Sequence, residues 1–133
     1  MRFTGRAVLI AILFIGVFAA LLGAQNKPDV PKYDLSHQQV FTGIVGQLKD
    51  YQCPVSGMIG THLALKEITE TLEVHMAPAA FMKEYGIVIH PGEKVQVTGV
   101  KVLFDGKPAV LARSVSVRNE TFSFRDEKGR PLW

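Results

Sequence analysis

The chain has 133 residues, with 15 lysines and arginines against 12 aspartates and glutamates, which gives a formal charge of +3 and a pI of about 9.1. Arg2 and Arg6 lie in an apolar N-terminal segment, and the remaining 13 basic and 12 acidic residues nearly balance. A domain without an excess of basic side chains lacks the charge that phosphate binding requires, so we do not expect a nucleic-acid partner. The single cysteine, Cys53, excludes an internal disulfide.

The N-terminal segment, residues 1–24, carries Arg2 and Arg6 and then an uncharged apolar run of 18 residues. Such a segment is either a cleaved signal peptide or a transmembrane signal anchor. The positive charges before the apolar run predict that the rest of the chain lies across the membrane. We therefore expect a protein that is anchored on the periplasmic side of the cytoplasmic membrane, or secreted into the periplasm after cleavage. Residues 25–37 contain two prolines and no apolar periodicity, and form a linker.

A single mainly β domain is expected at residues 38–125, followed by a polar C-terminal tail at residues 126–133. Apolar alternation and turn residues predict its strands, and the proline and glycine at either end of a short apolar segment predict one helix. The expected elements, in chain order, are a strand at 40–49, a loop at 50–60, a hairpin at 61–78, a helix at 78–85, strands at 93–103 and 109–117 around a turn at 105–108, and an edge strand at 120–125.

The hairpin at residues 61–78 is the most informative stretch, because its apolar side chains alternate strictly with other residues. Pairing Lys66 with Thr71 puts these apolar side chains opposite one another on one face. A slip of one residue would turn all of these side chains to the other face, so the register must keep them on the core side. The same register makes His62 and His75 direct neighbours on the outer face, where we expect them to be partly exposed.

The order of elements, with a helix between the third and fourth strands, resembles that of the OB-fold, a five-stranded Greek-key barrel. Residues 90–114 resemble the last hairpin of many OB domains, with a Pro-Gly-acidic turn, the mid-strand Gly99 and a Leu-Ala-Arg ending. With its N-terminal hydrophobic helix, the whole chain is similar to the small exported bacterial OB-fold domain proteins. This resemblance implies a binding face along the second and third strands, bordered by the loop at 50–60 and the turn at 105–108.

Three residues near this face are candidate metal ligands, namely Cys53, His62 and His75. A thiolate and two imidazoles suit Cu(I) or Zn(II), and Met58 in the same loop as the cysteine would add a thioether for copper. No compact motif such as C-x-x-C supports the site, so it depends on the hairpin register. The alternative is that the histidines make ordinary hydrogen bonds and Cys53 is a small buried hydrophobe.

The binding face predicts a ligand site, whose candidate residues are His62, Glu73, His75, Asp105 and Lys107. The chain lacks a Gly-x-Ser-x-Gly elbow, a phosphate-binding glycine loop and a paired carboxylate, so we do not expect an enzyme. We expect a membrane-associated binding module that recognises a protein partner or a small ligand on this face. The alternatives are a metal-binding accessory protein that uses the cysteine and the two histidines, and a structural subunit of a membrane complex.

Overall fold

The computed structural model describes residues 30–104 and 106–133. The predicted signal or anchor segment at residues 1–24 lies outside these described residues, and so does Asp105. Within the described part of the chain, no helix has both the length and the apolar character needed to cross a membrane.

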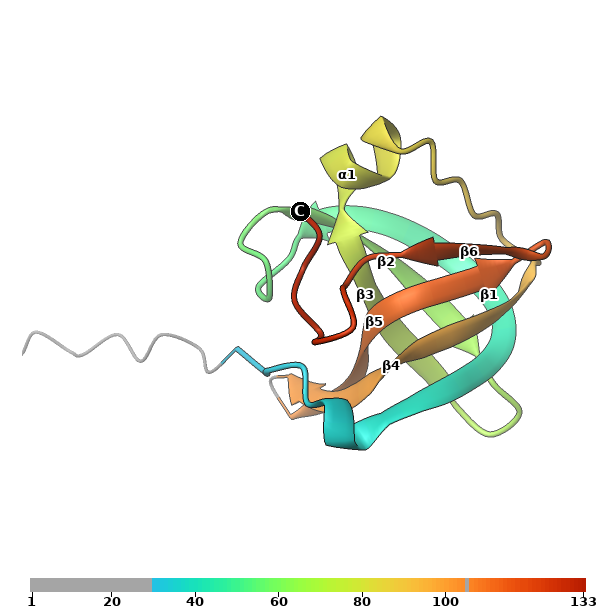
Figure 1. The fold of residues 1–133 in the computed structure, drawn as a ribbon. Coiled ribbons are helices and arrows are strands. Elements are labelled where there is room, and N and C mark those ends of the chain that lie inside the picture. The colour runs from blue at the N-terminus through green and yellow to red at the C-terminus, as the bar shows by residue number, and fades with distance from the viewer. Residues whose placement is uncertain (1–29, 105) are drawn as a thin grey trace, which may run out of the picture.

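Most of the described chain is β structure, as the sequence predicts. The elements, in order, are a short 3-10 helix (Leu35–His37), β1 (Gln38–Gln52), β2 (Ile59–Lys66), β3 (Thr71–Pro78), α1 (Ala79–Glu84), β4 (Lys94–Phe104), β5 (Lys107–Val117) and β6 (Glu120–Ser123). The strands form one sheet in the order β3-β2-β1-β4-β5-β6, and an additional pairing of β3 with β5 closes the first five strands into a ring (Figure 1). The β3–β5 pairing is parallel, whereas the consecutive neighbours in the sheet are antiparallel.

The mainly β class and the short helix between the third and fourth strands are confirmed. The ring has the five strands that were expected, and the sheet has six because β6 pairs with the end of β5. This sixth strand corresponds to the edge strand predicted at residues 120–125.

The long first strand joins the two halves of the ring. Its first half pairs with β4 and its second half with β2, with a register shift between Val45 and Leu48. Gly43 lets β1 lie close to the end of β2 near this shift, because a β-carbon at this position would lie 2.5 Å from the carbonyl oxygen of Lys66. The register shift is a β-bulge or irregularity of the kind that bends a strand.

The β2–β3 hairpin has the register that its hydrophobic pattern predicts. Lys66 pairs with Thr71, and the apolar pairs Leu65–Leu72 and Leu63–Val74 face one another. These four apolar side chains are at most 1% exposed and form part of the core inside the ring. Burial of one complete face of the hairpin fixes its register and thereby fixes which residues stand on the other face.

The C-terminal segment folds back onto the ring. Phe124 is fully buried, and its ring lies 6.4 Å from that of Phe81 on α1. The Trp133 ring lies 6.2 Å from the same phenylalanine, and the Leu132 amide donates to the Phe124 carbonyl at 3.0 Å. The chain therefore ends on the side of the ring where α1 lies (Figure 1).

Candidate metal centre

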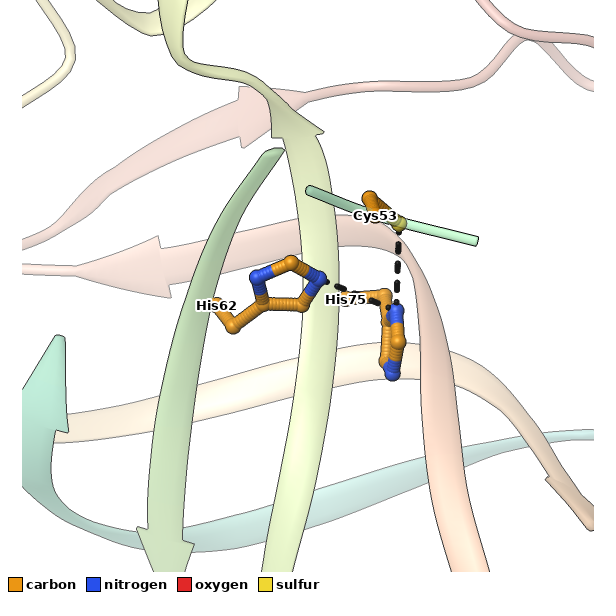
Figure 2. A group of neighbouring side chains, drawn as sticks. All are labelled: Cys53, His62 and His75. Carbon is orange, nitrogen blue, oxygen red and sulfur yellow. Dashed lines mark hydrogen bonds between the residues drawn. The ribbon is translucent and has the colours of Figure 1, made fainter. Parts of the chain in front are cut away.

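The structure brings Cys53, His62 and His75 together from three different elements. Cys53 follows β1 directly, whereas His62 lies on β2 and His75 on β3. His75 Nδ1 lies 3.1 Å from His62 Nε2 and 3.4 Å from Cys53 Sγ, and all three side chains point toward one another (Figure 2). The three potential ligand atoms lie within 4.8 Å of one another.

The loop between β1 and β2 holds the cysteine over the hairpin. The Cys53 amide donates to the Met58 carbonyl at 2.8 Å, and the Gly57 amide donates to the Cys53 carbonyl, also at 2.8 Å. Gly57 has a φ of +72°, which glycine adopts without a steric penalty. Gly60 then leaves room for the cysteine, because a β-carbon at that position would lie 2.9 Å from the Cys53 β-carbon.

The hairpin is irregular where it carries the histidines. His62 pairs with His75 as predicted, and the next pair is Thr61 with Ala77, so Met76 is an extra residue on β3. Such a bulge twists a strand locally and redirects its side chains. Met76 is 3% exposed and contributes both to the core and to a cavity beside the cysteine.

The cluster is more buried than the sequence predicts. Cys53, His62 and His75 are 4%, 3% and 8% exposed, so the expectation of partly exposed histidines is wrong. The Tyr51 ring stacks on the His62 ring with a centroid distance of 3.8 Å and an interplanar angle of 16°. This contact and the cover of the β1–β2 loop bury the outer face of the hairpin at this point.

Burial keeps both histidines neutral at physiological pH. Loss of solvation lowers the pKa of His75 from 6.5 to about 4. The pKa of His62 is also lowered to about 4, first by burial and then by the neighbouring His75, although backbone groups of Lys49 and Gly60 counteract this. Neutral imidazoles have a free nitrogen lone pair, which is the form that binds a metal ion.

One polar atom of the cluster has no partner. His62 Nδ1 is buried without a hydrogen bond. A buried polar group left in this state costs about 1–3 kcal/mol, so the cluster lowers the stability of the metal-free fold.

The predicted ligand residues Glu73 and Lys107 lie at the rim of the cluster. Glu73 Oε1 is 3.7 Å from His75 Nε2, the ring nitrogen that faces away from the cysteine. Glu73 and Lys107 line a groove of about 280 Å³ together with Tyr51 and Phe104. This groove reaches His75 from outside.

Sequence reasoning missed three residues that line the small cavity beside Cys53, namely Met76, Arg125 and Trp133. The cavity has a volume of about 20 Å³, which is enough for one water-sized sphere. Met58, proposed from sequence as a thioether ligand, is 43% exposed and does not line this cavity. The aromatic end of the chain was a signal that the tail packs somewhere, but nothing in the sequence pointed to Arg125.

These features define a small mainly β domain whose outer face carries a buried cluster of potential metal ligands. Residues 37–122 match the model of the MamS/MamX magnetosome protein family. The match covers more than half of the chain, and the chain belongs to this family.

The search of the curated proteins finds no match. Among solved structures, a chain of "OBody NL8 bound to hen egg-white lysozyme" is similar, with 14% sequence identity over 62% of this chain and 94% of that chain, and a TM-score of 0.45. A likeness at this level does not define the fold.

Proposed function

We propose that this domain binds a soft or borderline transition-metal ion, Cu(I) or Zn(II), through Cys53, His62 and His75. The observation that carries the proposal is the convergence of one sulfur and two ring nitrogens within 4.8 Å in a buried site. Metal–ligand distances of about 2.0–2.3 Å place ligand atoms roughly 3 to 4 Å apart. The observed separations of 3.1 and 3.4 Å lie within this range, and all three ligand atoms lie within 4.8 Å of one another, so small side-chain movements would complete the site.

The surroundings of His75 support the same proposal. Histidines that bind metal through one ring nitrogen commonly donate the other N–H to a carboxylate, which fixes the tautomer and the ring orientation. With His75 bound through Nδ1, its Nε2–H faces the Glu73 carboxylate, 3.7 Å away. Glu73 is thus placed to orient a metal ligand.

We propose a binding role without catalysis. A cavity of about 20 Å³ beside the cysteine has the size of a single ion or water and has no room for an organic substrate. For the fold, we propose the OB-fold plan, which the element order and the β3–β5 closure support.

For location, we propose membrane association on the periplasmic side. The apolar run in residues 1–24 and membership of a magnetosome protein family support this proposal. Retention of the chain in membranes after a high-salt wash would support an anchor. A mature chain that begins after residue 24 would show cleavage instead.

Anaerobic titration of the full chain with Cu(I) and with Zn(II), each against a chromophoric chelator, tests the metal proposal. We expect one equivalent of tightly bound metal, lost in Cys53→Ser and in His62→Ala. His90→Ala is the matched control, because this exposed histidine lies in a turn outside the cluster. Equal affinity in the wild type and the two cluster variants would refute the proposal.

A second candidate function is recognition of a protein partner or small ligand on the outer face. The groove lined by Tyr51, Glu73, Phe104 and Lys107 favours it. This function predicts that Lys107→Glu releases a co-purifying partner while the metal content stays unchanged. An identical set of co-purifying proteins in wild type and variant would remove this candidate.

A further inference from the structure

The cavity beside the cluster offers three strong metal donors and one weak donor. The strong donors are the Cys53 thiolate and the two imidazoles of His62 and His75. The weak donor is the thioether of Met76, which lines the same cavity. Thioethers and thiolates select soft ions such as Cu(I), whereas structural Zn(II) takes four strong ligands.

The hydroxyl groups of the residues that line this cavity already form hydrogen bonds. The Thr61 hydroxyl donates to Asp50 Oδ1 at 2.7 Å. The Ser56 hydroxyl accepts from the Met58 amide at 3.3 Å. Among the described residues that line the cavity, none therefore supplies a fourth strong ligand without breaking an existing contact.

A positive charge also lines the cavity. Arg125 Nη1 donates to the Gly129 carbonyl at 2.9 Å, and its guanidinium lies over the rings of Tyr33 and Trp133, 5.3 Å from each centroid. Its Nε is buried without a hydrogen-bond acceptor. Within the described chain, no carboxylate forms an ion pair with this guanidinium.

Arg125 makes a divalent ion more costly at this cavity than a monovalent ion. Among the described residues that line the cavity, Arg125 alone carries a permanent charge. A divalent ion brings twice the positive charge of a monovalent ion into a buried site next to this guanidinium. An uncompensated buried charge is expensive because the surroundings have a low dielectric constant.

We infer that the cluster selects monovalent copper, Cu(I), over divalent Zn(II), and that Arg125 sets this preference. This inference rests on the proposed metal site. The guanidinium opposes a second positive charge on the ion. Its Nε–H has no hydrogen-bond acceptor, and the side chain lines the same cavity as Cys53.

The test compares Cu(I) and Zn(II) affinities in the full chain carrying Arg125→Leu, which removes the charge and adds no metal donor to the cavity. We expect the ratio of Cu(I) to Zn(II) affinity to fall by at least about tenfold, because Zn(II) gains more from loss of the repulsion. Arg130→Leu is the matched control, since Arg130 is an exposed arginine of the same tail that pairs with Asp126. Its ratio should stay at the wild-type value.

The outcomes separate this inference from the proposed function. If both metals bind to the wild type but the ratio is unchanged in Arg125→Leu, the inference fails and the metal site stands. If neither metal binds to the wild type, the proposed function fails and the inference fails with it.

A second measurement needs only the wild type, in case the Arg125 variant does not fold. Addition of Cu(II) under argon should give no lasting thiolate-to-Cu(II) charge-transfer absorption, because the site disfavours a divalent ion. A stable visible absorption of this kind, lost in Cys53→Ser, would overturn the preference for monovalent copper.

Discussion

The two faces of the β2–β3 hairpin are both buried near His62 and His75, but in different ways and with opposite consequences. The inner face packs Leu63, Leu65 and their partners on β3 into the core of the ring. The outer face holds two neutral histidines and a cysteine under an aromatic ring and a short loop. One face is buried by its own apolar pattern, and the other by residues from elsewhere in the chain.

The inner face of the hairpin therefore stabilises the fold, whereas the outer face is suited to binding a ligand. Burial of the leucines is favourable by itself. Burial of imidazoles with an unpartnered nitrogen is unfavourable, and proteins keep such features where function requires them.

The largest effect is expected on the inner face. Leu65 is completely buried, and Leu65→Ala should lower the free energy of unfolding by about 3 to 5 kcal/mol through lost burial and the cavity left behind. Urea denaturation at pH 7 measures this change. Ile68→Ala in the fully exposed hairpin turn is the control and should change stability by less than about 0.5 kcal/mol. Similar losses in both variants would contradict the assignment of the core.

The next effect concerns pH and the outer face of the metal-free protein. Folded His62 and His75 have pKa values of about 4, against 6.5 for an ordinary histidine, so the unfolded chain takes up protons that the folded chain does not. Stability is therefore full above about pH 6.5, falls as the pH is lowered, and stops responding to these groups below about pH 4. We expect a loss of at least about 3 kcal/mol between pH 7 and pH 4, measured by urea denaturation. The same slope in His62→Leu/His75→Leu would show that other groups cause it.

The same double variant, His62→Leu/His75→Leu, tests at pH 7 whether the outer face contributes to stability or to metal binding. Replacement of both polar partners by apolar side chains should leave the free energy of unfolding within about 1 kcal/mol of wild type, or raise it. Cu(I) affinity should nevertheless fall by at least about a hundredfold, which exceeds the usual cost of losing an outer-shell contact. A stability loss as large as that of Leu65→Ala would mean that the histidines hold the fold together.

The smallest effect is expected at the rim. Glu73→Gln removes the carboxylate that faces His75 Nε2 and should weaken Cu(I) binding by about tenfold. Glu70→Gln is the control, because Glu70 lies in the preceding turn and pairs with Lys101 at 2.8 Å. Competition with a Cu(I) chelator measures both. Equal affinities would remove Glu73 from the site.

The sequence was sufficient to predict the hairpin register, because one strictly apolar face determines the register of the whole pair. The pairing of His62 with His75 follows directly from it. The short helix was also predictable from local signals, namely Pro78 at its start and Gly86 after its end, with a φ of +62°.

The burial of the candidate site was not predictable, because it depends on contacts between distant segments. Tyr51 covers His62, and Arg125 and Trp133 reach the cavity from the end of the chain. Met76 is also an extra residue on β3, so the simple alternation of a strand does not predict that it lines the cavity. Periodicity describes single strands and contains no information on which loop or tail lies over a face.

The central claim is that Cys53, His62 and His75 bind one metal ion together, and imidazole nitrogen NMR during Cu(I) addition tests it most directly. The chain has four histidines, and His37 and His90 are exposed internal controls. We predict that one equivalent of Cu(I) shifts His62 Nε2 and His75 Nδ1 together and leaves the two controls unchanged, and that Cys53→Ser abolishes the shift. Shifts at His37 or His90, or none at His62 and His75, would contradict the claim.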